Sequence, residues 1–527
     1  MKAQRLLHDA LFVRGESPET QARPALVADG QRYAFAELLI SARRLATALR
    51  ERGTRRGDRV AIALENSWAC VVSVYATLIV GGVIVLIHPQ TRAEKLRFIL
   101  ADSGARVFIA ERRQGALVAQ ALDRLDVRPA ILVADPSGNS PAESFDAAVA
   151  NAAPLAAPVS VIPLDLAAIL YTSGSTGEPK GVMQTHQSMV FTVGSLVEYL
   201  RLTPAERILC VLPLSFDYGL YQLLMAVSLG ACLVLERSFT FLGQLLERLS
   251  SERITVLPGV PTVFATLIAA NRRKPLHFPK VTRVTNTAAA LPDEFVASLR
   301  EIFPQALIYK MYGLTECKRV SYLEPELVDA KPGSVGKAIP GTEVYLLSDT
   351  GTPVPPGETG LLHVRGPHVI AGYWHRPDLS KEMLKPGPFP GERVLCTHDL
   401  FRMDDEGFLF FIGRTDDIIK TRGEKVSPVE VENALHRIRG VREAAVIGIT
   451  DPLLGEAVRA VIVADPAVEL TPQSIRAGCA SLLEPHMVPS QVVFRETLPR
   501  TSNGKVDKRQ LIDEAHREHS ADQESAR

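Results

Sequence analysis

The stretch "LAAILYTSGSTGEPKGV" (Leu166–Val182) joins an apolar, strand-like segment to small hydroxylated residues and glycines, closed by Lys180. Glycine lets a backbone approach a ligand closely, and Ser and Thr hydroxyls add hydrogen-bond donors without bulk. Consecutive N–H groups in such a loop attract anions, and a lysine at its edge adds a point charge. The stretch predicts a phosphate-binding loop, although flexible surface linkers share this composition. It is not a P-loop, because the second glycine of that motif, counted from Gly174, falls at Pro179.

Composition and charge exclude several classes of protein. Lys+Arg and Asp+Glu both number 59 among 527 residues, so the net charge of zero predicts no nucleic-acid partner. Six cysteines without a C-x-x-C pair argue against a disulfide framework and a zinc site. They are typical of small buried apolar residues in a reducing compartment, and we expect a cytoplasmic protein.

One uncharged segment, Ser67–Ile87, is long enough to cross a bilayer. Gly81-Gly82 divides it into a helix-like half and a β-branched, strand-like half. A buried helix followed by a buried parallel strand produces the same pattern. With no second such segment, we expect no integral membrane span.

Strand-like and helical segments alternate through the first third of the chain and beyond the glycine-rich loop, which predicts βαβ units and a parallel sheet. From about residue 335, short runs separated by D-T-G and P-P-G-E turns predict antiparallel hairpins. The charged turn Arg414–Asp417 suits either a hinge or a solvated loop. We expect domains at 1–414 and 415–513, followed by a polar, disordered tail at 514–527.

Three further stretches carry groups that suit a nucleotide. "MYGLTE" (Met311–Glu316) combines an aromatic face, a glycine, a hydroxyl and a carboxylate. "THDL" supplies Asp399, which can accept from two ribose hydroxyls, and "PRTSNGKVDK" presents Lys505 on an Asn-Gly turn. Each is a weak signal alone, because an exposed lysine beside Asn-Gly is usually only solvated.

Together, TSGSTGEPKG, MYGLTE, GSVGKAIPG, THDL, GRTDDIIKTRGEKVSPVEVE and NGKVDK resemble the AMP-forming adenylating superfamily over about residues 25–513. Its members are acyl-CoA synthetases, adenylation domains of peptide synthetases and beetle luciferases. The resemblance implies an α/β fold, with stacked parallel sheets and a small β-barrel in a large N-terminal domain and a smaller, mobile C-terminal α/β domain. It also implies that a carboxylate attacks the α-phosphate of ATP and that a thiol then displaces AMP.

The resemblance assigns roles to individual residues. The β- and γ-phosphates would be held by Thr172, Ser173, Gly174, Ser175, Thr176, Gly177 and Lys180. Tyr312 would stack on adenine beside Gly313, and Asp399 and Arg414 would hold the ribose. Glu316 would bind Mg²⁺ with the hydroxyls of Thr172 and Thr315 nearby. Lys505 would bridge the substrate carboxylate and the α-phosphate, which makes Lys505, Glu316 and Thr172 the expected catalytic residues. Asp416 would be the hinge that brings Thr421–Glu424 to a thiol tunnel.

The sequence departs from the family pattern at the acid substrate. Phe216-Asp217 matches the F-D of amino-acid-activating relatives, whose aspartate pairs with an ammonium group, but Asp217 also suits a helix N-cap. Ala288, Ala289 and Ala290 replace a commonly glycine-rich stretch and either narrow the acyl pocket or simply pack.

Lysine and arginine also stand in unusual places. Lys310 replaces an amide that relatives often place near adenine. Lys318 and Arg319 meet an acidic substrate group or a phosphate of the acceptor, or form a surface pair, which base rates favour.

The expected function is that of an AMP-forming acid–thiol ligase of the acyl-CoA synthetase type. It would use ATP and Mg²⁺, a small carboxylic acid, and the thiol of CoA or of the phosphopantetheine on a separate carrier protein. The alternative is a stand-alone amino-acid:carrier-protein ligase, and a luciferase-like oxygenase is the rival from another class.

Overall fold

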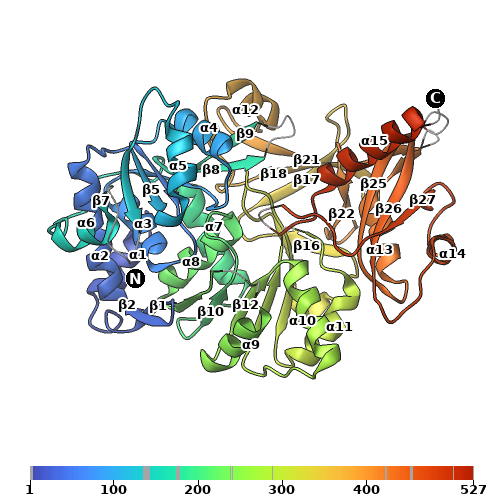
Figure 1. Cartoon of the computed structure of the whole chain (residues 1–527), viewed down its shortest axis with the longest axis horizontal. Coiled ribbons are helices and arrows are strands. Elements are labelled where there is room, and N and C mark those ends of the chain that lie inside the picture. Colours follow the sequence, from blue (N-terminus) through green and yellow to red (C-terminus); the bar gives the residue numbers. More distant parts are fainter. Residues whose placement is uncertain are drawn as a thin grey trace.

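The computed structural model describes residues 4–134, 143–173, 178–237, 239, 241–287, 289–421, 424–451, 455–501 and 504–525. Strands in these ranges form three sheets with helices packed against them (Figure 1). Two sheets of 8 and 14 strands build the large unit, and a 5-stranded sheet builds the smaller C-terminal unit. The α/β fold class expected from the alternating pattern is therefore confirmed.

The 8-stranded sheet carries the glycine-rich stretch at one side. Its parallel strands β3 to β8 continue into antiparallel β9 and β19. In sheet order, the strands are β19 (Gly372–Tyr373), β9 (Pro179–Thr185), β8 (Leu166–Ser173), β4 (Val83–Leu86), β3 (Arg59–Ala63), β5 (Val107–Glu111), β6 (Ala130–Ala134) and β7 (Glu143–Ser144).

The long uncharged segment is a buried helix and strand, as expected. Helix α3 (Trp68–Ile79) is buried along nearly its whole length, and β4 is completely buried. Between them Gly81 has φ +76°, a conformation that glycine adopts without a steric penalty. No helix within the described ranges is both long and apolar enough to cross a membrane.

The 14-stranded sheet contains a parallel half and an antiparallel half. The parallel half comprises β13 (Arg283–Asn286), β12 (Val256–Gly259), β10 (Arg207–Cys210), β11 (Cys232–Leu235) and β1 (Pro24–Ala28), with β14 (Leu307–Tyr312) beside β13 and antiparallel β2 (Gln31–Ala34) at the edge. The antiparallel half comprises β15 (Ser321–Leu323), β16 (Ser334–Ala338), β22 (Leu409–Arg414), β21 (Arg393–Met403), β18 (Thr359–Arg365) and β17 (Glu343–Leu347), with β20 (Leu384–Pro386) on β21.

The antiparallel half contains the expected hairpin, because β17 and β18 pair antiparallel. These strands were also expected to close into a small β-barrel. Within the described ranges, they instead pair in line from β17 to β16, and β16 joins them to the parallel half through β15. The hydrogen-bonded path is open, so the region continues the large sheet.

Helices α3, α7 (His186–Tyr199) and α8 (Asp217–Leu229) share one apolar core with residues of both large sheets (Figure 1). Ile62 of β3 and Leu209 of β10 belong to this same cluster. The other helices of the large unit are α1 (Asp9–Glu16), α2 (Phe35–Glu51), α4 (Ala93–Ser103), α5 (Gly115–Leu122), α6 (Phe145–Asn151), α9 (Leu242–Ser251), α10 (Pro261–Arg273), α11 (Asp293–Ile302) and α12 (Pro377–Met383), with 3₁₀ turns at Arg112–Gln114 and Pro325–Leu327.

The C-terminal unit has its own sheet with an apolar cluster on each face. Its strands are β24 (Glu424–Val426), β23 (Ile419–Thr421), β26 (Gly455–Ala464), β25 (Val441–Asp451) and β27 (Gln491–Phe494), and its helices are α13 (Pro428–His436), α14 (Pro472–Ala480) and α15 (Lys508–Ser525).

The expectation of a disordered tail from residue 514 is wrong for the described part, because α15 extends to Ser525. Leu511 and Ala515 are buried against the sheet. Arg459 of β26 pairs with Glu518 at 2.8 Å, and Arg495 pairs with Glu514 at 2.5 Å. These contacts hold the first turns of a polar helix whose own sequence offers little apolar surface.

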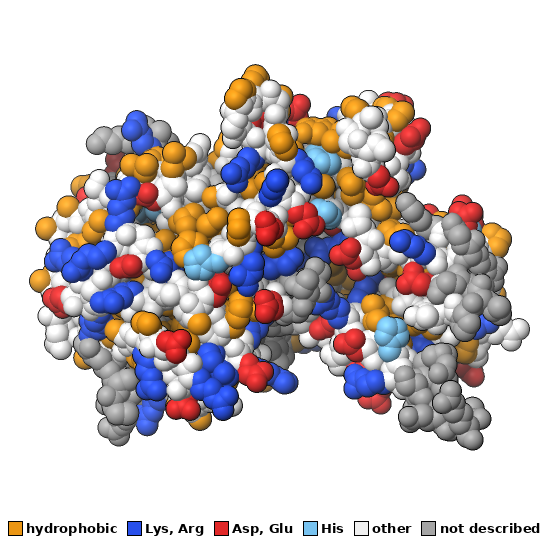
Figure 2. Space-filling model, turned by 90° about the horizontal axis from the view of Figure 1, so that it is seen from above, with side chains coloured by type: hydrophobic (Ala, Val, Ile, Leu, Met, Phe, Trp, Pro, Cys, Tyr) orange, Lys and Arg blue, Asp and Glu red, His pale blue; other side chains and the backbone are white. Residues whose placement is uncertain are grey.

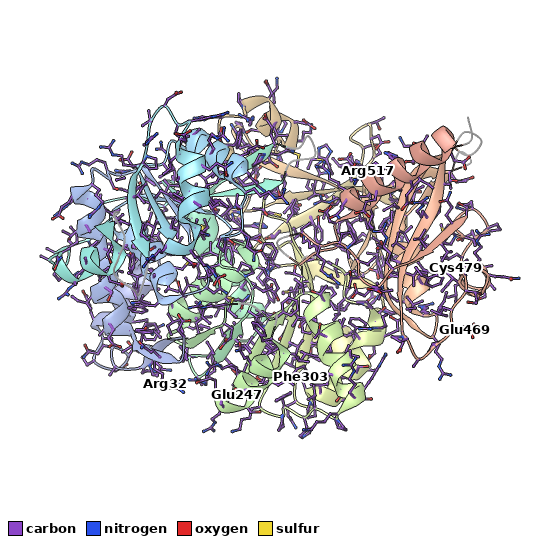
Figure 3. The ribbon with its side chains drawn as sticks, in the orientation of Figure 1. Arg32, Glu247, Phe303, Glu469, Cys479 and Arg517 are labelled. Carbon is purple, nitrogen blue, oxygen red and sulfur yellow. The ribbon has the colours of Figure 1, made fainter. Side chains whose placement is uncertain are left out.

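All six cysteines are free and buried, as their spacing predicts. Figure 3 shows Cys479 in the C-terminal unit at the right and Arg32 in the large unit at the lower left. On the face shown in Figure 2, acidic and basic side chains are interspersed. That distribution matches the zero net charge of the chain.

Candidate active site

Several predicted site residues lie at or just after the carboxyl ends of parallel strands, where ligands bind in open α/β sheets. Strand β10 leads into the start of α8, β12 into α10, and β14 ends at Tyr312. The turn that carries Lys505 comes from the C-terminal unit and is closed by a bridge between Arg500 and Val506. A Cβ added at Gly504 would lie 3.8 Å from both Val260 and Thr262. The turn therefore rests against the start of α10.

Lys505 is surrounded by charged groups of both signs. Loss of water around its ammonium group, followed by repulsion from Arg414, lowers the pKa of Lys505. The carboxylates of Asp217, Asp399 and Glu316 act in the opposite direction. Its side chain nevertheless keeps an exposed surface in the cleft. The described structure thus brings together four residues predicted for one site, Lys505, Arg414, Asp399 and Glu316. It also places the predicted substrate residue Asp217 near Lys505.

Asp399 and Arg414 are cross-strand neighbours on β21 and β22. Arg414 Nε lies 3.5 Å from Asp399 Oδ1, and the Tyr312 hydroxyl donates to Asp399 Oδ2. Burial raises the pKa of Asp399 more than Arg414 lowers it. The Tyr312 ring packs on Phe401 at 4.7 Å and on Phe411 at 6.0 Å. The ring and the two charged groups form one cluster.

Glu316 is oriented by a residue that the sequence reasoning missed. The Tyr373 hydroxyl donates to Glu316 Oε1 at 2.6 Å, and burial, followed by the Glu316 charge, raises the pKa of Tyr373. Tyr373 lies on the two-residue strand β19, opposite Val182 of β9. Gln184 Nε2, also on β9, donates to the carbonyl of Thr315 at 2.8 Å. No motif marked Tyr373 or Gln184, because their partners lie far along the chain.

Gly313 allows the turn after Tyr312 to fold back tightly. A Cβ at this position would lie 2.1 Å from the carbonyl oxygen of Lys318. The Lys318 N–H donates to the Leu314 carbonyl at 2.6 Å, and the Val320 N–H donates to the Tyr312 carbonyl at 2.9 Å. A side chain at residue 313 would push this turn open.

Part of the predicted phosphate loop is described. Thr172 and Lys180 are register partners on β8 and β9, and both side chains are partly exposed. Ser173 closes β8. The predictions for Gly174, Ser175, Thr176 and Gly177 lie outside the described residues.

Asp217 is the first residue of α8, whereas the N-cap is Phe216. The N-cap alternative for Asp217 is therefore wrong in its position. Its Oδ1 accepts from the N–H of Tyr218 at 2.8 Å, so it still serves the helix end, and only 7% of the residue is exposed. Lys505 Nζ lies 6.0 Å above the Phe216 ring.

The alanine stretch and Lys310 have simpler surroundings. Ala289 and Ala290 are exposed, and Ala288 lies outside the described residues. Lys310 is buried, and its Nζ donates to Asp293 at the start of α11. Lys310 is thus engaged by a carboxylate of the chain itself.

Lys318 and Arg319 do not form the surface pair that base rates favour. Lys318 is fully buried, and Arg319 is 2% exposed. Burial lowers the pKa of Lys318 to about 7, and burial with the Lys318 charge lowers the pKa of His368 to about 3. The turn around Gly313 directs both cations inward, which spacing alone did not reveal.

The two units are joined by the segment after Arg414. The N–H groups of Asp417 and Ile418 donate to the Arg414 carbonyl at 3.1 and 3.2 Å. Asp416 is exposed within this turn, Thr421 is buried on β23, and Glu424 is exposed. The large sheet ends at Arg414, and the C-terminal sheet begins at Ile419.

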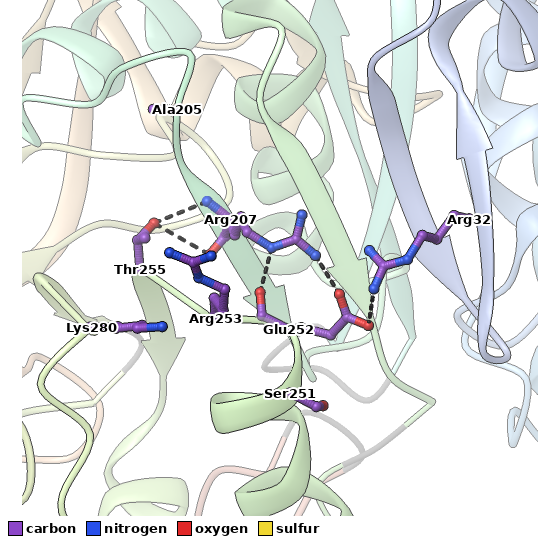
Figure 4. A pocket seen from close by; sticks show the side chains of 8 residues that line it. All are labelled: Arg32, Ala205, Arg207, Ser251, Glu252, Arg253, Thr255 and Lys280. Carbon is purple, nitrogen blue, oxygen red and sulfur yellow. Dashed lines mark hydrogen bonds and ion pairs between the residues drawn. The ribbon is translucent and has the colours of Figure 1, made fainter.

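A separate cavity of about 570 Å³ lies at the amino ends of β10 and β12 (Figure 4). Arg207 and Arg32 both donate to Glu252 there, Arg32 at 2.8 Å. The cavity is on the opposite edge of the sheet from Lys505 and shares no lining residue with the predicted site.

Comparison with known proteins agrees with this arrangement. The family model "AMP-binding enzyme" matches residues 15–374, and "AMP-binding enzyme C-terminal domain" matches residues 430–505. A long-chain-fatty-acid–CoA ligase of Bacillus subtilis is 30% identical over 520 residues, covering 93% of this chain and 91% of that protein. A feruloyl-CoA synthase of an Amycolatopsis species is 32% identical over 479 residues, covering 90% and 93%.

Among solved structures, an anthranilate CoA ligase in complex with anthranoyl-AMP superposes with a TM-score of 0.91 at 26% identity and covers 99% of both chains. The resemblance stated from the motifs is confirmed by these matches. The chain belongs to the AMP-binding enzyme family, and it is an AMP-forming acid–thiol ligase.

Proposed function

We propose that this enzyme activates a small carboxylic acid with ATP and passes the acyl group to the pantetheine thiol of CoA. The carboxylate oxygen forms a bond to the α-phosphorus, and the bond to pyrophosphate breaks. The thiol sulfur then bonds to the acyl carbon, AMP leaves, and the thiol proton passes to solvent. The observation that carries the proposal is the position of Lys505 over Phe216, within electrostatic reach of Asp217, Asp399 and Glu316.

Lys505 would offset the charge that accumulates when two anions approach each other, because an ammonium group placed in a cleft stabilises developing negative charge. Asp399 would accept from the ribose hydroxyls, and the charge of Arg414 opposes the rise in the pKa of Asp399 that burial causes. Thr172, Ser173 and Lys180, with Gly174–Gly177, would hold the pyrophosphate portion. Tyr312 and Gly313 would border the adenine.

The residues present suit Mg²⁺, which binds proteins through one or two carboxylates and takes phosphate oxygens and water as further ligands. Tyr373 donates to one oxygen of Glu316 and so fixes the orientation of this carboxylate. The described ranges contain no group of three or more His, Cys, Asp or Glu that could hold a metal alone. Glu316, with the hydroxyls of Thr172 and Thr315 nearby, would hold the ion, whose charge would be shared with the phosphates.

We also propose that residues 1–414 form the adenylation domain and that residues 415–513 form a domain that turns about Asp416. Two reactions that share one site need two arrangements, and Lys505 serves only the first. The turn would bring the Thr421–Glu424 segment to the thiol. The separate sheets on either side of residues 415–418 support this division.

Asp217 distinguishes the acyl-CoA ligase from the amino-acid:carrier-protein alternative. Its carboxylate is near enough to both Lys505 and Lys318 to act on their charges. Because the chain itself supplies these cations, we favour an acid without an ammonium group, and hence CoA rather than a carrier protein as acceptor.

The test is pyrophosphate release with hydroxylamine trapping across aliphatic, aryl and amino acids, followed by CoA-dependent release of AMP. We expect acid-dependent pyrophosphate and equal amounts of AMP and thioester. The comparison variant is Asp217→Asn, which removes the charge and keeps the shape. Activity with an amino acid that this variant loses would establish the alternative, and absence of pyrophosphate with every acid would overturn the proposal.

A further inference from the structure

Arg319 is a buried cation that forms no ion pair with a carboxylate in the described ranges. Its Nη1 donates to the Lys318 carbonyl at 2.7 Å, but Nε and Nη2 find no hydrogen-bond partner in the described part of the chain. Nε and Nη2 form one edge of the guanidinium, the edge that can bind both oxygens of a carboxylate. The neighbouring Lys318 donates only to neutral oxygens, Ser188 Oγ at 3.0 Å and the His368 carbonyl at 2.8 Å.

This arrangement is costly in the absence of a ligand. Burying an unpaired ion destabilises the fold, and arginine cannot avoid this penalty by losing a proton. The Tyr218 ring lies 4.7 Å from the Arg319 guanidinium and stabilises its charge through a cation–π contact. The ring covers one face of the guanidinium, whereas the free edge needs an acceptor in its plane.

The backbone adds a second, independent indication. Lys318 has φ +62°, a left-handed conformation that is sterically strained for a non-glycine residue. The conformation follows from the tight turn over Gly313, and it turns Lys318 and Arg319 into the protein together. Strain of this kind is concentrated at functional sites.

The first turn of α8 connects Arg319 to Lys505. Phe216 lies beneath Lys505, Tyr218 lies beneath Arg319, and the two rings meet edge to face at 6.5 Å. Asp217, between these rings in sequence, does not pair with Arg319, because Nη1 of Arg319 bonds the Lys318 carbonyl and its Nε and Nη2 have no partner among the described residues. The two cations therefore flank one helical turn, and Arg319 keeps two unpartnered guanidinium nitrogens among the described residues.

We propose that the acid activated by this enzyme carries a second anionic group on its acyl part, which binds the free Nε–Nη2 edge of Arg319 while the reacting carboxylate lies at Lys505. The simplest such substrate is a dicarboxylic acid. The inference rests on the function proposed above and defines its substrate class. An acid with an uncharged acyl part would leave the buried guanidinium unpaired.

The experiment compares unbranched mono- and dicarboxylic acids of matched chain length by pyrophosphate release with hydroxylamine trapping. For wild type we expect kcat/KM for the best diacid to exceed that for its monoacid by about 100-fold or more, because a site with an unpaired polar group rejects analogues that lack its partner. Arg319→Met should abolish this ratio while KM for ATP stays unchanged, and Arg319→Lys should restore part of it. Arg207→Met, at the other edge of the sheet, is the matched control and should leave the ratio unchanged.

Binding supplies a readout that is independent of turnover. The diacid should raise the melting temperature of wild type and leave that of Arg319→Met unchanged. Without substrate, Arg319→Met should melt at the same temperature or higher, because the unpaired charge is gone. If Arg319→Met does not fold, the wild-type ratio and Arg319→Lys still decide.

Wild type that prefers monocarboxylic or amino acids, or a ratio that Arg319→Met does not change, would overturn the inference and leave the proposed function intact. Failure of the proposed function has a different signature, since no acid of either series would then release pyrophosphate.

Discussion

The arginines at the two ends of the parallel strands in the 14-stranded sheet differ in whether a carboxylate of the chain pairs with them. At the amino ends, Arg207 and Arg32 share Glu252, and Arg283 lies 3.2 Å from Glu206. At the carboxyl ends, Arg319 is only 2% exposed, less than any of these three arginines, and its Nε and Nη2 have no partner in the described ranges.

This difference distinguishes a cation that stabilises the fold from a cation that is available to bind a ligand. A pair that the chain completes by itself is fixed at folding and stabilises the sheet edge. An incomplete pair costs stability and is retained where a ligand supplies the missing charge. Cavity size does not make this distinction, because the cavity in Figure 4 lies at the completed end.

The largest expected effect sharpens the comparison at the carboxyl end. Lys505→Ala should lower the rate of adenylation about 1000-fold or more, equivalent to about 4 kcal/mol in the barrier, because the cation that meets both anions is lost. Transfer from a synthetic acyl adenylate to CoA should stay within about tenfold of wild type. Pyrophosphate release and thioester formation measure the two steps. Equal loss of both would contradict the role assigned to Lys505.

Gly313→Ala should produce the next largest effect. Its Cβ would meet the Lys318 carbonyl, so the turn that buries Arg319 must open, at a cost of about 3 kcal/mol in unfolding free energy. Denaturant unfolding and KM for ATP measure the change. The control is Gly194→Ala within α7, where nothing lies within 4 Å of an added Cβ. The control should gain up to about 1 kcal/mol through helix propensity.

At the amino end, Arg207→Met tests whether the Arg207–Glu252 ion pair contributes only to the free energy of unfolding and not to catalysis. Glu252 is 7% exposed at its side chain and would keep only Arg32 as a partner. We expect a loss of about 2 kcal/mol in unfolding free energy, less than for a pair left with no partner, and an unchanged kcat. A fall in kcat that exceeds the loss of folded protein would show that the amino end also acts in catalysis.

The smallest effect concerns a buried group that avoids charge by releasing its proton. Burial, followed by the charge of His8, lowers the pKa of His186 to about 4, while Asp165 and Asp9 act in the opposite direction. The stability that neutral His186 contributes is therefore complete above its unfolded pKa of about 6.5 and is lost as pH falls toward about 4. The slope is at most about 1.4 kcal/mol per pH unit.

His186→Asn removes this titration and keeps an acceptor for the N–H of Leu7, which bonds Nδ1 at 3.3 Å. The difference in unfolding free energy between wild type and variant should narrow between pH 7 and about pH 5. The double variant with His8→Asn separates the contributions of the two histidines, whose rings lie 5.9 Å apart. A constant difference across this range would exclude His186 as the titrating group.

Local signals were sufficient for most of the fold. The alternation of short apolar strands with amphipathic helices predicted the parallel sheets, and Gly81-Gly82 divided α3 from β4 correctly. The polar composition of the C-terminal tail misled, because α15 is held by Arg459 and Arg495. Those partners come from other elements, and composition carries no information about them.

The site followed the same rule. The motifs correctly grouped Tyr312, Asp399 and Lys505: Tyr312 ends β14, Asp399 lies within β21 and accepts from the Tyr312 hydroxyl, and Lys505 lies within the electrostatic influence of Asp399. Spacing could not reveal that Tyr373 would contact Glu316, or that the turn over Gly313 would bury Arg319. Such contacts depend on how elements meet in space, which is also why the preference for a surface pair failed.

Arg414 contacts both the proposed nucleotide site and the connection to the C-terminal unit, and this affects the order of the two half-reactions. Its guanidinium approaches the carboxylate assigned to the ribose, and its carbonyl accepts the two N–H groups that shape the connection to the C-terminal unit. A nucleotide that displaces the side chain acts on the residue from which that connection starts. Departure of AMP and reorientation of the C-terminal unit would then both change the contacts of Arg414. The order of the two half-reactions would follow from this one residue, with no further residue needed to link them.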